Sequence, residues 1–117
     1  MSKKILVVDD EPQIVKYLTT FLEDSGYDTC SASNGEEALE VLKKENPDLV
    51  TLDLQMPNET GTRFYRNMTK DKKFKDLPVI VISGIPGRHL AVTKPFAVFD
   101  KPIDRDALLQ AIKTAIG

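Results

Sequence analysis

Four short apolar runs in this chain each end at polar side chains that could do chemistry. The polar groups are Asp9 with Asp10, then Asp53, Ser83 and Lys101. A short apolar run bounded by turn signals is typical of a buried strand, and ligands of open α/β sheets bind outside the carboxyl ends of such strands. If the four strands are parallel neighbours, these five side chains converge on one edge of the sheet.

The residue types at this edge suit phosphoryl chemistry. Three buried carboxylates repel one another, so they need a cationic partner. Mg2+ prefers oxygen ligands and is often shared between carboxylates and phosphate, while Lys101 supplies a compact positive charge. A carboxylate flanked by a magnesium ion, a lysine and a hydroxyl can attack phosphorus in line, with the other groups stabilising the equatorial oxygens. The residues therefore indicate a site that accepts a phosphoryl group as a labile acyl phosphate.

The elements that must position these groups alternate between strand and helix patterns. Strands are expected over residues 5–8, 27–32, 49–53, 78–82 and 97–100. Helices are expected to begin at Pro12, after Asn34 as N-cap, at Gly61, and after Asp104 as N-cap. This alternation predicts a parallel sheet with helices on both faces. Between the last two strands, glycines and prolines interrupt the helical pattern, so residues 88–93 are expected to form a turn or two of helix at most.

Composition limits the classes of protein that fit. The chain has 117 residues, 41% of them hydrophobic and 29% charged, which suits one globular domain over residues 1–117. The net charge of −2 gives no electrostatic case for binding nucleic acid or a membrane surface. Cys30 is the only cysteine, and the apolar run near the N-terminus is too short for a signal peptide or a membrane span. We therefore expect a cytoplasmic location.

Four motifs, in this order and spacing, resemble the receiver domain of two-component response regulators, and the resemblance covers essentially the whole chain. They are Val7-Val8-Asp9-Asp10-Glu11-Pro12, Leu52-Asp53-Leu54-Gln55-Met56-Pro57 with Gly61 beyond, Val81-Ile82-Ser83-Gly84, and Phe99-Asp100-Lys101-Pro102. The resemblance implies a single flavodoxin-like (βα)5 domain with a parallel sheet of order 2-1-3-4-5. In this chain the fourth helix of that fold is expected to be short or irregular.

The resemblance also implies how the acidic residues divide their roles. Asp53 would be the phosphoacceptor. Asp9 and Asp10 would hold Mg2+, directly or through water, together with Asp53 and the backbone carbonyl of Gln55. In such a domain the phosphoryl group comes from a sensor histidine kinase or a histidine phosphotransfer protein.

The remaining groups would assist the transfer. The Ser83 hydroxyl would contact the phosphoryl group, Lys101 would be its counter-ion, and the Lys101–Pro102 peptide bond would be cis. The domain would be a signalling module rather than an enzyme, although it would catalyse its own phosphorylation and dephosphorylation. Its output would be phosphorylation-controlled contact with a downstream protein.

Two departures from the family pattern concern the output. An aromatic residue commonly lies three positions before the lysine in relatives, whereas this chain has Val98 there. Phe99 is one position later and should therefore point to the opposite face of the strand. The connection between Ser83 and Lys101 is also several residues shorter than is usual. We therefore expect that the usual switch coupling the hydroxyl to an aromatic side chain does not operate.

Three other functions fit the sequence less well. A receiver-like scaffold that works without phosphorylation is the alternative hypothesis, and Val98 and the short connection favour it. A phosphatase of the haloacid-dehalogenase type would need an acid where Gln55 stands. A flavin-binding protein would need a phosphate-binding loop where Asp9, Asp10 and Glu11 would repel phosphate. His89 is interpreted as a surface residue.

Overall fold

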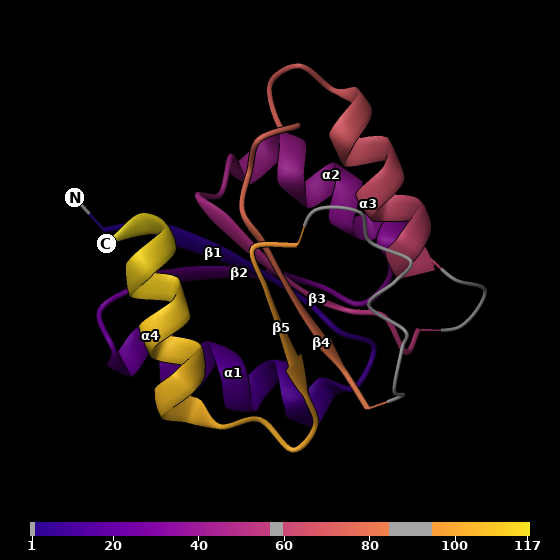
Figure 1. The fold of residues 1–117 in the computed structure, drawn as a ribbon. Helices are drawn as coiled ribbons and strands as arrows, with labels where there is room; N and C mark the ends of the chain where they lie inside the picture. The colour runs from indigo at the N-terminus through magenta and orange to yellow at the C-terminus, as the bar shows by residue number, and fades with distance from the viewer. Residues whose placement is uncertain (1, 57–59, 85–94) are drawn as a thin grey trace.

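The computed structural model describes residues 2–56, 60–84 and 95–117, and these form alternating strands and helices (Figure 1). In chain order the elements are β1 (Lys4–Val8), α1 (Pro12–Asp24), β2 (Asp28–Ala32), α2 (Gly35–Glu45), β3 (Leu49–Asp53), α3 (Thr60–Lys70), β4 (Val79–Ser83), β5 (Ala97–Asp100) and α4 (Arg105–Ile116). The expected short helix over residues 88–93 lies outside the described residues.

The five strands form one parallel sheet in the order β2-β1-β3-β4-β5, which confirms the flavodoxin-like topology. The register pairs Asp53 with Ile82 and Ser83 with Asp100. The carboxyl ends of β1, β3, β4 and β5 therefore meet at one edge of the sheet, as the sequence predicted.

The sheet separates two hydrophobic clusters, one under α1 and α4 and the other under α2 and α3 (Figure 1). Ile5 and Val7 of β1 belong to the cluster under α1 and α4. Leu6 and Val8 belong to the cluster under α2 and α3. Because both faces of the central strands are covered, the strands are apolar at successive positions instead of alternating with polar residues.

Local signals explain where several helices begin. The Asn34 side chain accepts a hydrogen bond from the Glu37 amide at 2.8 Å, and Asp104 accepts one from the Ala107 amide at 3.1 Å. Both predicted N-caps are therefore confirmed. At the start of α3, a Cβ on Gly61 would lie 2.8 Å from the backbone oxygen of Asp53. The glycine thus lets α3 approach the end of β3 closely.

Several boundaries differ from the sequence prediction by one residue. Strand β1 begins at Lys4 instead of residue 5, and β4 covers Val79–Ser83 instead of residues 78–82. Tyr27 precedes β2 instead of belonging to it, and its ring is buried against the cluster under α1 and α4. Its amide donates to the Leu22 carbonyl, so Tyr27 closes the turn that follows α1. Helix α3 begins at Thr60, one residue before the predicted Gly61. Across the described ranges, every helix is too short or too polar to cross a bilayer.

Thr51, in the middle of β3, gives a prediction about stability. It is 1% exposed, and its hydroxyl oxygen has no hydrogen-bond partner among the described residues. An unpaired buried hydroxyl costs free energy that an apolar group of similar shape does not. Thr51→Val is therefore expected to raise the free energy of unfolding by about 1 kcal/mol in urea denaturation. Thr51→Ser is the control, since it keeps the hydroxyl and loses the methyl group; a Thr51→Val protein less stable than the wild type would contradict the prediction.

Candidate functional site

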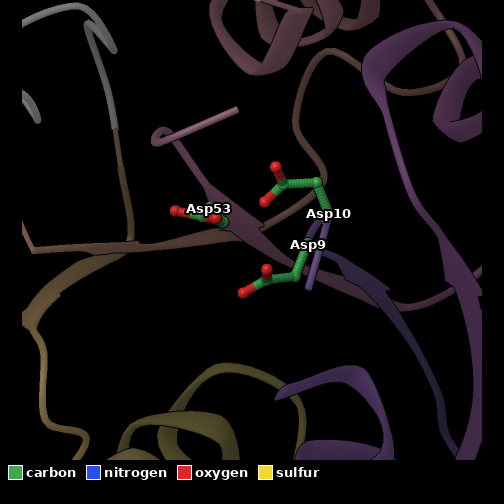
Figure 2. A group of neighbouring side chains, drawn as sticks. All are labelled: Asp9, Asp10 and Asp53. Atoms are coloured by element: carbon green, nitrogen blue, oxygen red, sulfur yellow. The ribbon is translucent and has the colours of Figure 1, made fainter. Parts of the chain in front are cut away.

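Three carboxylates gather at the carboxyl edge of the sheet. Asp9 and Asp10 directly follow β1, and Asp53 is the last residue of β3. Figure 2 shows the three side chains extending from neighbouring strand ends, and one oxygen from each lies within 4.8 Å of the others. Asp9 and Asp53 are each 2% exposed, while Asp10 is more open to solvent. The convergence predicted from the sequence is therefore present in the fold.

Backbone amides orient the two buried carboxylates. The Glu11 amide donates to Asp9 Oδ1 at 2.9 Å, and the Gln55 amide donates to Asp53 Oδ1, also at 2.9 Å. In each case the donor lies two residues beyond the acid, where the chain turns out of the strand. The second oxygen of Asp53, Oδ2, is buried and has no hydrogen-bond partner among the described residues. One oxygen of Asp53 is thus held by the backbone, while the other remains available for a ligand or a reaction.

Lys101 supplies the positive charge opposite these acids. Its Nζ lies 3.7 Å from Asp53 Oδ2, 3.8 Å from Asp9 Oδ2 and 3.8 Å from a Glu11 carboxylate oxygen. Its amide donates to the Ser83 carbonyl at 3.0 Å, and the Lys101–Pro102 peptide bond is cis, as expected. The three distances from Lys101 Nζ to carboxylate oxygens are longer than those of a hydrogen-bonded ion pair. The ammonium group therefore lies between the acids and is not hydrogen-bonded to any one of them.

Burial disfavours the charged forms of the two inner carboxylates. The pKa of Asp9 is raised to about 6, chiefly by burial and also by the charges of Asp53 and Asp10, against the opposing effects of the Glu11 amide and Lys101. Burial likewise raises the pKa of Asp53, against the Gln55 amide and Lys101. The charge of Lys101 therefore does not offset the cost of burying these acids.

The raised pKa of Asp9 gives a prediction about pH. Because its folded-state pKa of about 6 exceeds the ordinary aspartate value of 3.8, the ionised carboxylate destabilises the fold above pH 6, and this cost disappears as the pH falls toward 3.8. In EDTA, the melting temperature is therefore expected to be higher at about pH 5 than at about pH 7. Asp9→Asn removes the titrating group and should flatten this difference. Identical pH profiles for the variant and the wild type would contradict the prediction.

The acidic cluster fits a hard divalent cation. Carboxylate oxygens are the ligands that Mg2+ prefers, and Asp53 Oδ2 is a buried acceptor to which no donor in the described part of the chain is hydrogen-bonded. Asp10 is more exposed than Asp9 and Asp53, and Mg2+ usually keeps several of its water molecules. The donor set is therefore of the kind expected for Mg2+, as the sequence indicated.

Ser83 and Gln55 complete the edge. Ser83, the last residue of β4, is 2% exposed. The side chain of Gln55 accepts a hydrogen bond from the Gly84 amide, a contact that the sequence did not suggest. Sequence reasoning also missed the approach of Glu11 to Lys101, although Glu11 belongs to the same acidic run as Asp9 and Asp10.

The alternation along β5 bears out the expectation for Val98 and Phe99. Val98 is 37% exposed, whereas Phe99 is partly buried against the cluster under α1 and α4. The two side chains therefore point to opposite faces of the sheet. Phe99 cannot take the place of an aromatic residue at position 98 without a change of strand register.

Comparisons with known proteins agree with the geometry. The sequence model of the response regulator receiver domain matches residues 5–113. The Rrf1 protein of Nitratidesulfovibrio vulgaris is 34% identical over all of this chain, which covers 85% of that protein. The PhoP transcriptional regulatory protein of Bacillus subtilis is 37% identical over 96% of this chain, which spans only 49% of that relative. The crystallised chemotaxis protein CheY4 of Vibrio cholerae superposes with a TM-score of 0.89 at 26% identity, with 99% of this chain and 100% of that chain covered.

Proposed function

This chain belongs to the response regulator receiver domain family, and we propose that Asp53 is the residue on which it accepts a phosphoryl group. Receiver domains are signalling domains of two-component systems, and phosphorylation of an aspartate is typical of them. The proposal assigns this role to Asp53, with Asp9 and Asp10 as metal ligands and Ser83 and Lys101 as partners of the phosphoryl oxygens.

The observation that supports the proposal best is the environment of Asp53 Oδ2. This oxygen is buried, lacks a hydrogen bond among the described residues, and lies 3.7 Å from Lys101 Nζ. Carboxylate oxygens of Asp9, Asp10 and Asp53, one from each residue, lie within 4.8 Å of one another. A structural acid in a core would normally have both oxygens satisfied, so an unsatisfied oxygen beside a lysine and two more acids favours a reactive carboxylate.

The chain's own residues would carry out the transfer as follows. A carboxylate oxygen of Asp53 forms a bond to phosphorus as the phosphorus–nitrogen bond of a phosphohistidine breaks, and the leaving imidazole takes up a proton. The Gln55 amide holds Asp53 Oδ1 and thereby orients the carboxylate. The Lys101 ammonium and the Ser83 hydroxyl stabilise the charge that spreads over the equatorial oxygens.

The same proposal includes a magnesium ion held by Asp9, Asp10, Asp53 and the backbone carbonyl of Gln55. When bound, Mg2+ would neutralise negative charge on the phosphoryl oxygens and on the acids. The acids would provide oxygen ligands, and Mg2+ usually retains several water molecules besides such ligands. The raised pKa values of Asp9 and Asp53 support this assignment, because they indicate that the buried acids need more positive charge than Lys101 supplies.

The family supports a proposal about which kind of protein donates the phosphoryl group. Receiver domains are phosphorylated by sensor histidine kinases, and one relative of this chain is named a sensor kinase/phosphatase, CqsS of Vibrio cholerae. We therefore propose a histidine kinase or a histidine phosphotransfer protein as donor, a downstream protein as target, and a cytoplasmic location. The proposal further treats residues 1–117 as one receiver domain that catalyses its own phosphorylation and dephosphorylation.

Beryllofluoride, which mimics a phosphoryl group on a carboxylate, tests the proposed function. In NMR spectra, the amides of Gln55, Gly84 and Lys101 are expected to shift when beryllofluoride and Mg2+ are both present. They should not shift in the same way with beryllofluoride alone or in the Asp53→Asn variant. Unchanged spectra with both ligands would contradict the proposal and support the phosphorylation-independent scaffold.

A further inference from the structure

The side chain of Gln55 links two strand ends at the proposed phosphoryl site. Its amide oxygen, Oε1, accepts a hydrogen bond of 2.6 Å from the Gly84 backbone N–H. The backbone N–H of the same residue donates to Asp53 Oδ1 at 2.9 Å. One residue therefore contacts both the proposed phosphoacceptor and the residue that follows Ser83.

This contact extends the sheet beyond the end of β3. The Leu54 amide still donates to the Ile82 carbonyl, at 3.4 Å, just after the last paired residues of β3 and β4. In a parallel ladder, the next bond would run from the Gly84 amide back to a backbone carbonyl of the neighbouring strand. The Gln55 side chain supplies an acceptor for that amide after the backbone of β3 has turned away.

The hydrogen bond between Gln55 and Gly84 depends on the lack of a side chain at Gly84. A Cβ at this position would lie 2.6 Å from Gln55 Oε1 and 3.3 Å from the adjoining amide carbon. Both separations are shorter than ordinary van der Waals contact, so a larger residue would displace the Gln55 amide. The glycine thus leaves space for the Gln55 side chain to reach the backbone.

We propose that the Gln55 side chain is a positioning residue, which ties the segment after Asp53 to the end of β4 and thereby fixes the place of the Ser83 hydroxyl. The inference rests on the proposed function, in which the Ser83 hydroxyl stabilises charge on the phosphoryl oxygens. On the other side, the Ser83 carbonyl accepts from the Lys101 amide at 3.0 Å. With both bonds made, the backbone around Ser83 is held between the Asp53 segment and the Lys101 segment.

Holding the hydroxyl in place matters because groups that stabilise a transition state act best when they need no reorganisation. Gln55→Met keeps the length of the side chain and removes the acceptor. We expect this variant to be phosphorylated by a small-molecule donor about three- to tenfold more slowly, the change that corresponds to the net free energy of one hydrogen bond. Its Mg2+ affinity should change much less, because the proposed metal ligand at this position is the backbone carbonyl.

Hydrogen exchange of the Gly84 amide tests the contact independently of phosphorylation. Exchange should be faster in Gln55→Met than in the wild type and should be slowed again in Gln55→Glu, which restores an acceptor at the same reach. The Leu54 amide, which donates to a backbone carbonyl, is the internal reference and should be unaffected. Unchanged exchange at Gly84 in Gln55→Met would show that the contact does not exist in solution.

A double-mutant cycle with Gly84→Ala separates positioning from general damage. Gly84→Ala alone should slow phosphorylation, because the added methyl group displaces the Gln55 amide. In a Gln55→Ala background, Gly84→Ala should slow phosphorylation little further, because the Gln55 side-chain amide has already been removed. Two results would overturn the proposal. One is faster hydrogen exchange at Gly84 in Gln55→Met together with an unchanged or higher rate of phosphorylation, and the other is fully additive effects in the double-mutant cycle. A wild-type protein that takes up no phosphoryl group would instead overturn the proposed function.

Discussion

Asp53→Asn is expected to abolish phosphorylation of this protein by any donor. The amide is nearly isosteric with the carboxylate, but it lacks the anionic oxygen that would attack phosphorus. The variant should remain folded, because the substitution removes one of three clustered negative charges while its side-chain oxygen can still accept from the Gln55 amide. Intact mass after incubation with a phosphodonor and Mg2+ measures the first effect, and thermal unfolding in EDTA measures the second.

The control for this experiment is Asp48→Asn, which changes an aspartate that lies before β3, outside the acidic cluster. It should be phosphorylated to the same extent as the wild type. If the Asp53→Asn protein still gained a phosphoryl group, peptide mapping would identify another acceptor, and the assignment of Asp53 would be wrong.

Lys101→Ala is expected to lower the rate of phosphorylation by about 100-fold or more, which is typical for the loss of a charged group that stabilises a transition state. The variant should still bind Mg2+, because its ligands are oxygen atoms of other residues. The metal-free protein should become less stable, since Lys101 Nζ lies within 4 Å of two buried carboxylates that would lose their cation. Phosphorylation kinetics, Mg2+ titration by calorimetry and thermal unfolding measure these three effects.

Lys72→Ala serves as the matched control. This lysine is exposed and belongs to the connection between α3 and β4, not to a strand end of the acidic edge. It should leave all three quantities near their wild-type values. A complete loss of Mg2+ binding in Lys101→Ala would mean that the electrostatics of the site have been misinterpreted.

Apolar residues at successive positions of β1, β3 and β4, together with a separate signal at the start of each helix, were enough to predict a parallel sheet covered by helices, whereas the order of the strands came from the family resemblance. Asn34 and Asp104 cap helices through side-chain bonds that depend on residues only three positions away. Local chemistry of this kind is visible in a sequence. The predicted strand boundary at Tyr27 was wrong. A buried tyrosine is typical of a strand, but here the ring is buried in the cluster under α1 and α4 while the backbone lies in a turn.

The gathering of the site's side chains was predictable to a similar degree, since Asp9-Asp10 and Asp53 directly follow apolar runs and Lys101 follows another after Asp100. Their convergence depends only on parallel neighbouring strands. The tie between Gln55 and Gly84 was not predictable, because it depends on where two segments 29 residues apart turn out of the sheet. The approach of Glu11 to Lys101 likewise depends on the path of two chain segments beyond the strand ends. No local pattern in the sequence marks either contact.

The most direct test of the central claim is the intact mass of the wild-type protein after incubation with a small-molecule phosphodonor, once with Mg2+ and once with EDTA. We predict a gain of one phosphoryl group that requires Mg2+ and is lost on treatment with hydroxylamine, which cleaves acyl phosphates. A protein that binds neither Mg2+ nor beryllofluoride and gains no mass with Mg2+ present would contradict the account. In that case the acidic edge would belong to a scaffold that works without phosphorylation.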